Sequence, residues 1–202
     1  MMIKNLLVLI LAYLLGSIST SIIVSKIMIG DDIRNHGSGN AGATNTLRTV
    51  GKLGAILVIL GDCLKTVAAI LLAKLILKDT PLAIYIAGIG AVLGHNFPLY
   101  FKFKGGKGIV VSAVSIIFAD PLLGSLTALV AILIMGISRY VSLGSILGAV
   151  FFALASLIFK TQNTEFVVFS FMLSILAIYM HKTNIKRLLS GTESKLSFKK
   201  KS

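Results

Sequence analysis

The chain has 202 residues, of which 56% are hydrophobic and 13% are charged. Soluble domains are typically about 45–50% apolar with about 25% charged residues, so this composition excludes an ordinary soluble protein and indicates a membrane protein. The 20 Lys and Arg residues against 7 Asp and Glu give a net charge of +13. These charges lie in connections between apolar segments and do not form one basic domain, which argues against a nucleic-acid partner.

The apolar segments predict an all-α membrane protein with seven transmembrane helices. In chain order they are Leu6–Ile27, Leu53–Leu77, Ala83–Gly94, Ile109–Ala119, Pro121–Ile137, Leu143–Phe159 and Glu165–Met180. A crossing takes about 20 residues, which 83–94 and 109–119 do not reach, and whether these two cross fully is left open. Because they flank a polar, glycine-rich loop, we expect two short helices around a partly re-entrant cytoplasmic loop. We predict one transmembrane domain over 1–202, with a basic, disordered cytoplasmic tail at 195–202.

The distribution of basic residues predicts the orientation in the membrane. If the chain crosses the membrane seven times, the loops 26–52, 95–108 and 138–142 and the tail from 181 all lie on the same side. Together they carry fifteen of the 20 Lys and Arg residues. The opposite loops carry only Lys4, Lys74, Lys78 and Lys160. The positive-inside rule therefore places the basic loops in the cytoplasm and the N-terminus outside.

The first cytoplasmic loop, 31–48, has the composition of an anion-binding segment. Gly37, Gly39 and Gly42 allow backbone N–H groups to converge, Ser38 adds a hydroxyl donor, and Arg48 can bind phosphate oxygens in a bidentate manner. The alternative is a flexible, Asn-rich turn. We favour a functional loop because glycines, a hydroxyl, amides and an arginine occur together here in a membrane protein.

The second cytoplasmic loop, 94–108, ends in Gly105-Gly106-Lys107-Gly108 at the predicted start of a helix. Backbone donors, the positive end of a helix dipole and a lysine would then act on one anion. The Walker A spacing G-x-x-x-x-G-K-[ST] is absent, so nucleotide hydrolysis is not expected.

Three further features complete the candidate chemistry. If the last helix continues past the membrane, His181 and Asn184 lie three residues apart on one face. Asp62 and Lys65 form a self-neutralising pair within a span, which is either functional or a structural brace. The three histidines lie in different loops and there is no cysteine cluster, so we expect no metal and no cofactor.

Four groups of residues carry a resemblance to a known family. They are Gly37-Ser38-Gly39-Asn40-Ala41-Gly42-Ala43-Thr44-Asn45 with Arg48; Gly94-His95 to Pro98 with Lys104-Gly105-Gly106-Lys107-Gly108; Ser142 with Ser145; and His181, Asn184, Arg187, Gly191 and Glu193. In this order and spacing, the chain resembles the PlsY family of bacterial acyl-phosphate:glycerol-3-phosphate acyltransferases over nearly its whole length.

The resemblance implies transfer of a fatty acyl group from acyl phosphate to the 1-hydroxyl of glycerol 3-phosphate, giving lysophosphatidate and phosphate for phospholipid synthesis. It implies seven helices in the bacterial inner membrane, a cytoplasmic active site and no cofactor. The implied catalytic residues are Ser38, Arg48, Lys107 and Asn184 around the acyl phosphate, and His181 toward glycerol phosphate. The implied substrate-binding residues are Gly37, Gly39, Asn40, Thr44, Asn45, His95, Lys104, Gly105, Gly106, Gly108, Ser142, Arg187 and Glu193.

Several alternatives stay open at this point. The general base is either His181 or a phosphate oxygen of a substrate, and an acyl intermediate on Ser38 is disfavoured because no carboxylate partners the histidine. A small anion or phosphate-ester transporter is the competing function, although the polar residues gather on one side and no inverted repeat is evident. The expected partners are the two substrates and membrane lipid. The sequence does not determine the acyl-chain preference or the oligomeric state, for which a monomer is one option.

Overall fold

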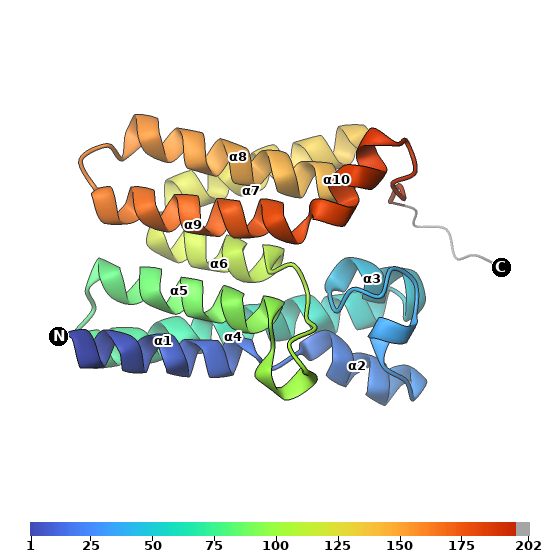
Figure 1. Ribbon diagram of the computed structural model, residues 1–202, viewed down its shortest axis with the longest axis horizontal. Coiled ribbons are helices and arrows are strands. Elements are labelled where there is room, and N and C mark those ends of the chain that lie inside the picture. The colour runs from blue at the N-terminus through green and yellow to red at the C-terminus, as the bar shows by residue number, and fades with distance from the viewer. Residues whose placement is uncertain (197–202) are drawn as a thin grey trace. The chain divides into compact units, whose positions relative to one another are not determined.

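The computed structural model describes residues 1–196, and every regular element among them is helical, which confirms the predicted all-α class. The elements are α1 Met2–Gly16, α2 Thr20–Ile29, α3 Ala43–Thr49, α4 Lys52–Leu77, α5 Pro81–Asn96, α6 Ile109–Ala119, α7 Pro121–Ser138, α8 Val141–Phe159, α9 Thr164–Met180 and α10 Lys182–Leu189, with 3₁₀ turns η1 Ile33–Asn35 and η2 Leu99–Phe101 (Figure 1). The chain divides into two compact units, Met1–Pro121 and Leu122–Ser202.

Helix length and composition support most of the predicted spans. Five stretches are long and apolar enough to cross a membrane, namely Met2–Ile29, Lys52–Leu77, Pro81–Phe101, Pro121–Ser138 and Val141–Phe159, and α9 with α10 qualifies as a bent sixth. The third stretch extends beyond the predicted 83–94. Helix α6 has 11 residues, or about 17 Å at 1.5 Å per residue, against a hydrocarbon core of about 30 Å. A count of seven spans therefore stays a prediction.

The first predicted span is not one continuous helix, because the chain leaves the helical path between Gly16 and Thr20. At the break, the hydroxyl of Ser17 donates to the carbonyl of Tyr13 (2.8 Å). The carbonyl of Ile18 accepts a hydrogen bond from Nζ of Lys65 (2.8 Å). Backbone groups in lipid need partners within the protein, so these contacts make the interruption tolerable.

In the first unit, glycines bring α1 and α5 into close contact, and the two helices run side by side (Figure 1). Gly90 and Gly94 lie one turn apart on α5, and a Cβ atom at Gly94 would overlap the backbone of Tyr13 and Ser17. The hydroxyl of Tyr13 donates to the carbonyl of Phe97 (2.8 Å). Small residues allow membrane helices to approach closely, and here the approach fixes the point where the second loop begins.

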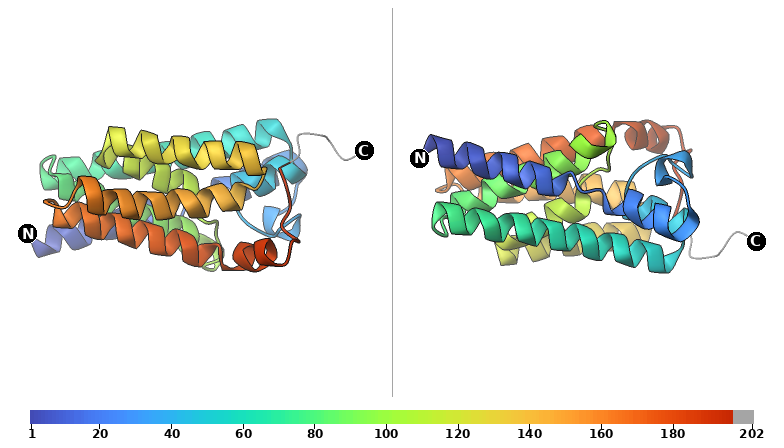
Figure 2. Two further views of the ribbon diagram at one scale, coloured as in Figure 1. Left: turned by 90° about the horizontal axis from the view of Figure 1, so that it is seen from above. Right: turned by 90° about the horizontal axis from the view of Figure 1, so that it is seen from below.

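Helix α4 is the long element of the first unit and packs along both α1 and α2 (Figure 2). A Cβ atom at Gly61 would overlap the side chain of Thr20, so α4 and α2 are also in close contact. The two helices formed by the broken first span are thus both held against the same partner.

The second unit is built on α7, α8 and α9. Helices α8 and α9 lie side by side (Figure 1). Phe152 of α8 makes edge-to-face contacts with Phe166 and Phe169 of α9 at centroid distances of 5.8 and 6.4 Å. On α8, Gly144 and Gly148 pack against α7. Helices α7 and α9 are thus both held against α8.

The start of the predicted basic tail is attached to this second unit. The N–H of Leu196 donates to the carbonyl of Arg139 (2.7 Å), and Nζ of Lys195 lies 5.6 Å from the centroid of the Tyr140 ring. Lys195 and Leu196 therefore contact the α7–α8 connection, and the disorder predicted for 195–202 stays a prediction. The rest of that prediction, 197–202, lies outside the described residues.

Replacement of Gly90 by Ala should destabilise the α1–α5 contact, because the added Cβ would lie 2.8 Å from the carbonyl oxygen of Leu9 and 2.9 Å from Cβ of Ala12. Overpacking of this kind typically costs about 1–3 kcal/mol. The matched control is Gly136→Ala on α7, where an added Cβ meets no atom within 4 Å. We expect a lower thermal unfolding midpoint in detergent for Gly90→Ala alone; equal midpoints for the two variants would contradict the close contact.

Candidate active site

The side chain of Asn45, on α3, organises the first glycine-rich loop. Its Nδ2 donates to the carbonyls of Ile33 (3.2 Å) and His36 (2.9 Å), and its Oδ1 accepts the N–H of Ser38 (2.9 Å). Gly37 has a φ of +58°, and a side chain there would overlap the Asn45 amide. Asn45 is 1% exposed, so its polar atoms act inside the protein to fix the loop around Ser38.

This loop presents Ser38 and Arg48 at the surface. Gly39, with a φ of +71°, lies after Ser38 in the left-handed backbone region, as Gly37 does before it. Arg48 lies in the last turn of α3, and both Ser38 and Arg48 are exposed, whereas Asn40 and Thr44 are half-buried. A hydroxyl and a guanidinium are therefore accessible on one short segment of fixed conformation.

Arg34 connects the first loop to the second, a role that sequence analysis did not assign. Its Nη1 donates to the carbonyls of Phe101 (2.8 Å) and Lys104 (3.1 Å), while its Nη2 pairs with Oδ2 of Asp32 (2.8 Å). The hydrogen bonds from Arg34 outweigh burial and lower the pKa of the Asp32 carboxyl. Because positions 34 and 101 are far apart in the chain, no local sequence pattern could have indicated this contact.

Backbone hydrogen bonds fold the second loop back onto the end of α5. The N–H of Gly105 donates to the carbonyl of Asn96 (3.2 Å), and the N–H of Gly106 donates to that of His95 (3.1 Å). A Cβ atom at Gly105 would overlap the His95 carbonyl, and one at Gly106 would overlap the His95 ring. Glycine is thus required at both positions for close approach, and these two N–H groups are used within the loop.

Lys107 lies immediately before the N-terminus of α6, as the sequence predicted. Gly108, with a φ of +71°, forms the N-cap, and α6 begins at Ile109. The first N–H groups of a helix have no acceptor within it, and they carry a partial positive charge. Lys107 is half-buried and Lys104 is exposed. The helix terminus and the Lys107 ammonium together form an electropositive end of the first unit.

In the second unit, Glu193 is the acceptor for three predicted site residues. Its Oε1 accepts from Oγ of Ser142 and Nδ2 of Asn184, both at 2.7 Å, and its Oε2 pairs with Nε of Arg187 at 2.7 Å. Burial opposes ionisation, but the hydrogen bonds from Arg187, Asn184 and Ser142 outweigh it and lower the pKa of Glu193. The structure brings these three side chains together around the Glu193 carboxylate.

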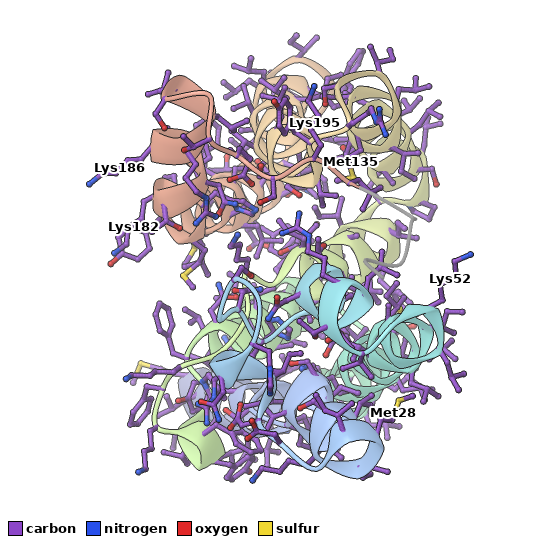
Figure 3. All side chains as sticks on the ribbon, turned by 90° about the vertical axis from the view of Figure 1, so that its right-hand side faces the viewer. Met28, Lys52, Met135, Lys182, Lys186 and Lys195 are labelled. Atoms are coloured by element: carbon purple, nitrogen blue, oxygen red, sulfur yellow. The ribbon has the colours of Figure 1, made fainter. Side chains whose placement is uncertain are left out.

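His181 marks a sharp bend and does not continue a straight helix. The axes of α9 and α10 differ by 58° at this residue, so the helical path continues past Met180 only with a bend. Nδ1 of His181 lies 2.8 Å from the carbonyl of Ala177, and a carbonyl only accepts, so in the neutral ring Nδ1 carries the proton. His181 and Asn184 are both buried, whereas Lys182 and Lys186 extend outward from α10 (Figure 3).

Among the described residues, no group of three or more His, Cys, Asp or Glu side chains is arranged to hold a metal ion. The polar groups gathered in each unit are hydroxyls, amides and basic side chains, together with carboxylates that pair with basic side chains, such as Asp32 with Arg34 and Glu193 with Arg187. Such a donor-rich set suits oxyanions such as phosphate esters.

The chain is similar to proteins of one enzyme family along nearly its whole length. Residues 6–191 match the family model described as glycerol-3-phosphate acyltransferase. Relatives of that name from Thermoanaerobacter sp. (strain X514) and Clostridioides difficile (strain 630) are 47% identical over 190 residues and 45% identical over 195 residues, covering 94% and 95% of each chain. The relative from Bacillus subtilis (strain 168) is 42% identical over 193 residues, covering 95% of this chain and 97% of its own.

Two crystal structures of PlsY, an integral membrane glycerol 3-phosphate acyltransferase, are also similar. The glycerol 3-phosphate form has a TM-score of 0.87 at 36% identity, and the lysophosphatidic acid form has a TM-score of 0.84 at 33% identity; each comparison covers 96% of both chains. The identity to curated relatives and the match to the family model agree with the resemblance found in the loops. This chain belongs to the glycerol-3-phosphate acyltransferase family of integral membrane enzymes.

Proposed function

We propose that this protein transfers a fatty acyl group from acyl phosphate to the 1-hydroxyl of glycerol 3-phosphate, as a step of phospholipid synthesis. The observation that carries the proposal is the similarity, over 96% of the chain, to structures in a glycerol 3-phosphate form and a lysophosphatidic acid form. These two molecules differ by one acyl group, so they are the acceptor and the product of a single acylation.

The reaction needs charge stabilisation more than it needs a strong nucleophile. The 1-hydroxyl oxygen bonds to the acyl carbon, the bond between that carbon and the phosphate oxygen breaks, and the hydroxyl proton leaves. Inorganic phosphate is a good leaving group, so orientation and electrostatic stabilisation can supply much of the catalysis. We assign Arg48, Lys107 and Ser38 to the departing phosphate, and His181 and Asn184 to the positioning of glycerol phosphate.

Two groups can accept the proton of the 1-hydroxyl. One is Nε2 of His181, because the contact of Nδ1 with the Ala177 carbonyl leaves Nε2 as the basic nitrogen. The other is a phosphate oxygen of a substrate. Neither alternative requires a covalent acyl-enzyme intermediate.

The remaining site residues fall into two proposed roles. Lys104, Asn40, Thr44 and Gly39 contribute to binding directly or through the loop backbone. The others act by holding binding groups in place: Asn45 and Gly37 in the first loop, Gly105, Gly106 and Gly108 in the second, and Ser142, Arg187 and Glu193 in the second unit.

We further propose that the protein lies in the bacterial cell membrane with its N-terminus outside and its basic loops in the cytoplasm. The supporting observation is the concentration of Lys and Arg in alternate loops. Glycerol 3-phosphate would then be taken directly from the cytoplasm.

The test of function is phosphate release by the purified protein with palmitoyl phosphate, with and without glycerol 3-phosphate, and with palmitoyl-CoA as the competing donor. We expect release only with the acceptor present, equimolar with lysophosphatidate. Lys107→Ala should lower the rate by roughly 10²–10³-fold, the usual loss for one preorganised charge-stabilising donor. Lys186→Ala on the outer face of α10 is the matched control (Figure 3). Transfer from palmitoyl-CoA alone would contradict the proposed donor.

Glu193→Gln should destabilise the second unit in a pH-dependent manner. Because the folded-state pKa of Glu193 lies below the ordinary value of 4.5, its carboxylate stabilises the fold above that pH. This stabilisation is lost as the pH falls through the folded-state pKa. We therefore expect the variant to have a lower thermal unfolding midpoint at neutral pH, with the difference from the unsubstituted protein shrinking on acidification.

The control for this experiment is Glu165→Gln, which removes an exposed carboxylate from the first turn of α9. A midpoint difference for Glu193→Gln that stayed constant from neutral pH to below pH 4 would contradict the role of the ionised carboxylate.

A further inference from the structure

A buried polar cluster in the first unit lies directly behind the second loop. It consists of Asp62 and Lys65 on α4, His95 at the end of α5, and the carbonyl of Ile18 in the broken first span. Asp62, Lys65 and His95 are 2%, 6% and 8% exposed. Ionisable side chains inside a membrane segment are costly, so such a cluster calls for an explanation beyond filling space.

Lys65 makes three contacts that match its three N–H bonds. Its Nζ lies 2.8 Å from Oδ1 of Asp62, 2.8 Å from the carbonyl oxygen of Ile18 and 3.0 Å from Nδ1 of His95. Asp62 is held in turn by the hydroxyl of Thr20, which donates to the same Oδ1 (3.1 Å). The ammonium is therefore fixed in position by two oxygen acceptors while it faces the imidazole.

This geometry determines which nitrogen of His95 carries the proton. An ammonium group donates and cannot accept, so Nδ1 of His95 accepts from Lys65. Oδ1 of Asp62 lies 3.6 Å from Nδ1, which is too far for a hydrogen bond. The neutral ring therefore has its proton on Nε2.

Nε2 faces the place where the two glycine-rich loops meet. A Cβ atom added to Gly106 would overlap Nε2 of His95 and would lie 2.6 Å from the carbonyl oxygen of Ala41. Within the described part of the chain, Nε2 has no hydrogen-bond partner. A donor of fixed direction is thus left unused beside the Gly105–Gly108 segment.

An anion bound at the second loop would need hydrogen-bond donors other than the backbone N–H groups of Gly105 and Gly106. The N–H groups of Gly105 and Gly106 are already bonded to carbonyls at the end of α5. An anion at this segment must then be bound by the terminal N–H groups of α6, by Lys107 and by other nearby side chains. His95 is buried behind the segment and supplies one such group.

We propose that Lys65, held by Asp62, fixes the tautomer of His95 so that Nε2–H serves as a neutral hydrogen-bond donor to a phosphate oxygen bound at Gly105–Gly108. This proposal rests on the proposed function, in that it takes a phosphate-bearing substrate as the ligand. Lys65 and Asp62 are positioning residues, and His95 is the group that contacts the ligand. The ligand chemistry, a phosphate monoester or acyl phosphate, is shared by both substrates.

The tautomer can be read directly by ¹⁵N NMR of the detergent-solubilised full chain labelled at its three histidines, with His95→Phe used to assign the signal. We expect Nε2 of His95 to be protonated and Nδ1 to be bare, and inorganic phosphate to shift the Nε2–H resonance. In the Asp62→Asn/Lys65→Met double variant, which removes both charges together, a population protonated at Nδ1 should appear. Protonation at Nδ1 in the unsubstituted protein, or a signal insensitive to phosphate, would overturn the proposal.

Kinetics separate a binding role from a structural brace. In His95→Phe, which keeps a ring but no donor, we expect the KM for one phosphate-bearing substrate to rise by about 10–100-fold, the usual effect of losing a hydrogen bond to a charged group. His95→Gln, which retains an N–H group, should recover most of this loss. Separate KM values for palmitoyl phosphate and glycerol 3-phosphate identify the substrate that His95 contacts.

A purely structural role would lower kcat with the fraction of folded protein and leave both KM values unchanged, and this result would refute the proposal. The NMR experiment uses inorganic phosphate and does not depend on turnover. A phosphate-sensitive Nε2–H in a protein without acyl transfer would therefore refute the proposed function while leaving the role of His95 standing.

Discussion

An ammonium group in the apolar part of a membrane protein needs an acceptor for each of its N–H bonds, because no water is present to replace a missing one. Lys65 finds acceptors on three separate elements: Asp62 in its own helix, the carbonyl of Ile18 between α1 and α2, and the ring of His95 at the end of α5. The Lys65 ammonium thus satisfies a backbone carbonyl at the helix break and also holds the His95 ring at the base of the second loop. Removing one partner of a buried ion pair is strongly destabilising, so these elements depend on one another.

The two glycine-rich loops next to this cluster are held in place by specific contacts. Gly37 accommodates the Asn45 amide, and Gly106 accommodates the ring of His95. In both places glycine permits close approach by a polar side chain, and the Asn45 amide also hydrogen-bonds the neighbouring backbone at Ser38 and His36. Arg34 then joins the two loops through the carbonyls of Phe101 and Lys104. Binding groups held in this way need little ordering when a ligand arrives, which favours both affinity and catalysis.

The sequence was informative wherever the signal was local. Apolar length located the helices, and Gly105–Gly108 correctly predicted a helix starting at once, because Gly and Lys act within a few residues of their position. Hydropathy placed the end of the last span at Met180, but it could not show that the chain bends by 58° at His181 and continues as α10. It also did not locate the break after Gly16, because the few polar residues there lie within a long apolar run and the compensating contact to Ile18 comes from another helix. The sequence also could not show the hydrogen bond between Ser142 and Glu193, which are 51 residues apart in the chain. The resemblance implied that both residues bind substrate, whereas in the structure their side chains bond to each other.

The excess of basic over acidic side chains explains why a phosphate-bearing substrate suits this protein. The acidic side chains Asp31, Asp32, Asp62, Asp79 and Glu193 each pair with a basic side chain of the same chain: His36, Arg34, Lys65, Lys74 and Arg187 respectively. With 20 Lys and Arg residues against 7 Asp and Glu, these pairings leave a large positive excess that the protein's own carboxylates cannot neutralise. Much of that excess lies in the loops that carry Ser38, Arg48 and Lys107, where the clustered positive potential attracts anions from solution. A doubly charged phosphate ester supplies the missing negative charge, whereas a neutral ligand would leave the repulsion among these groups in place.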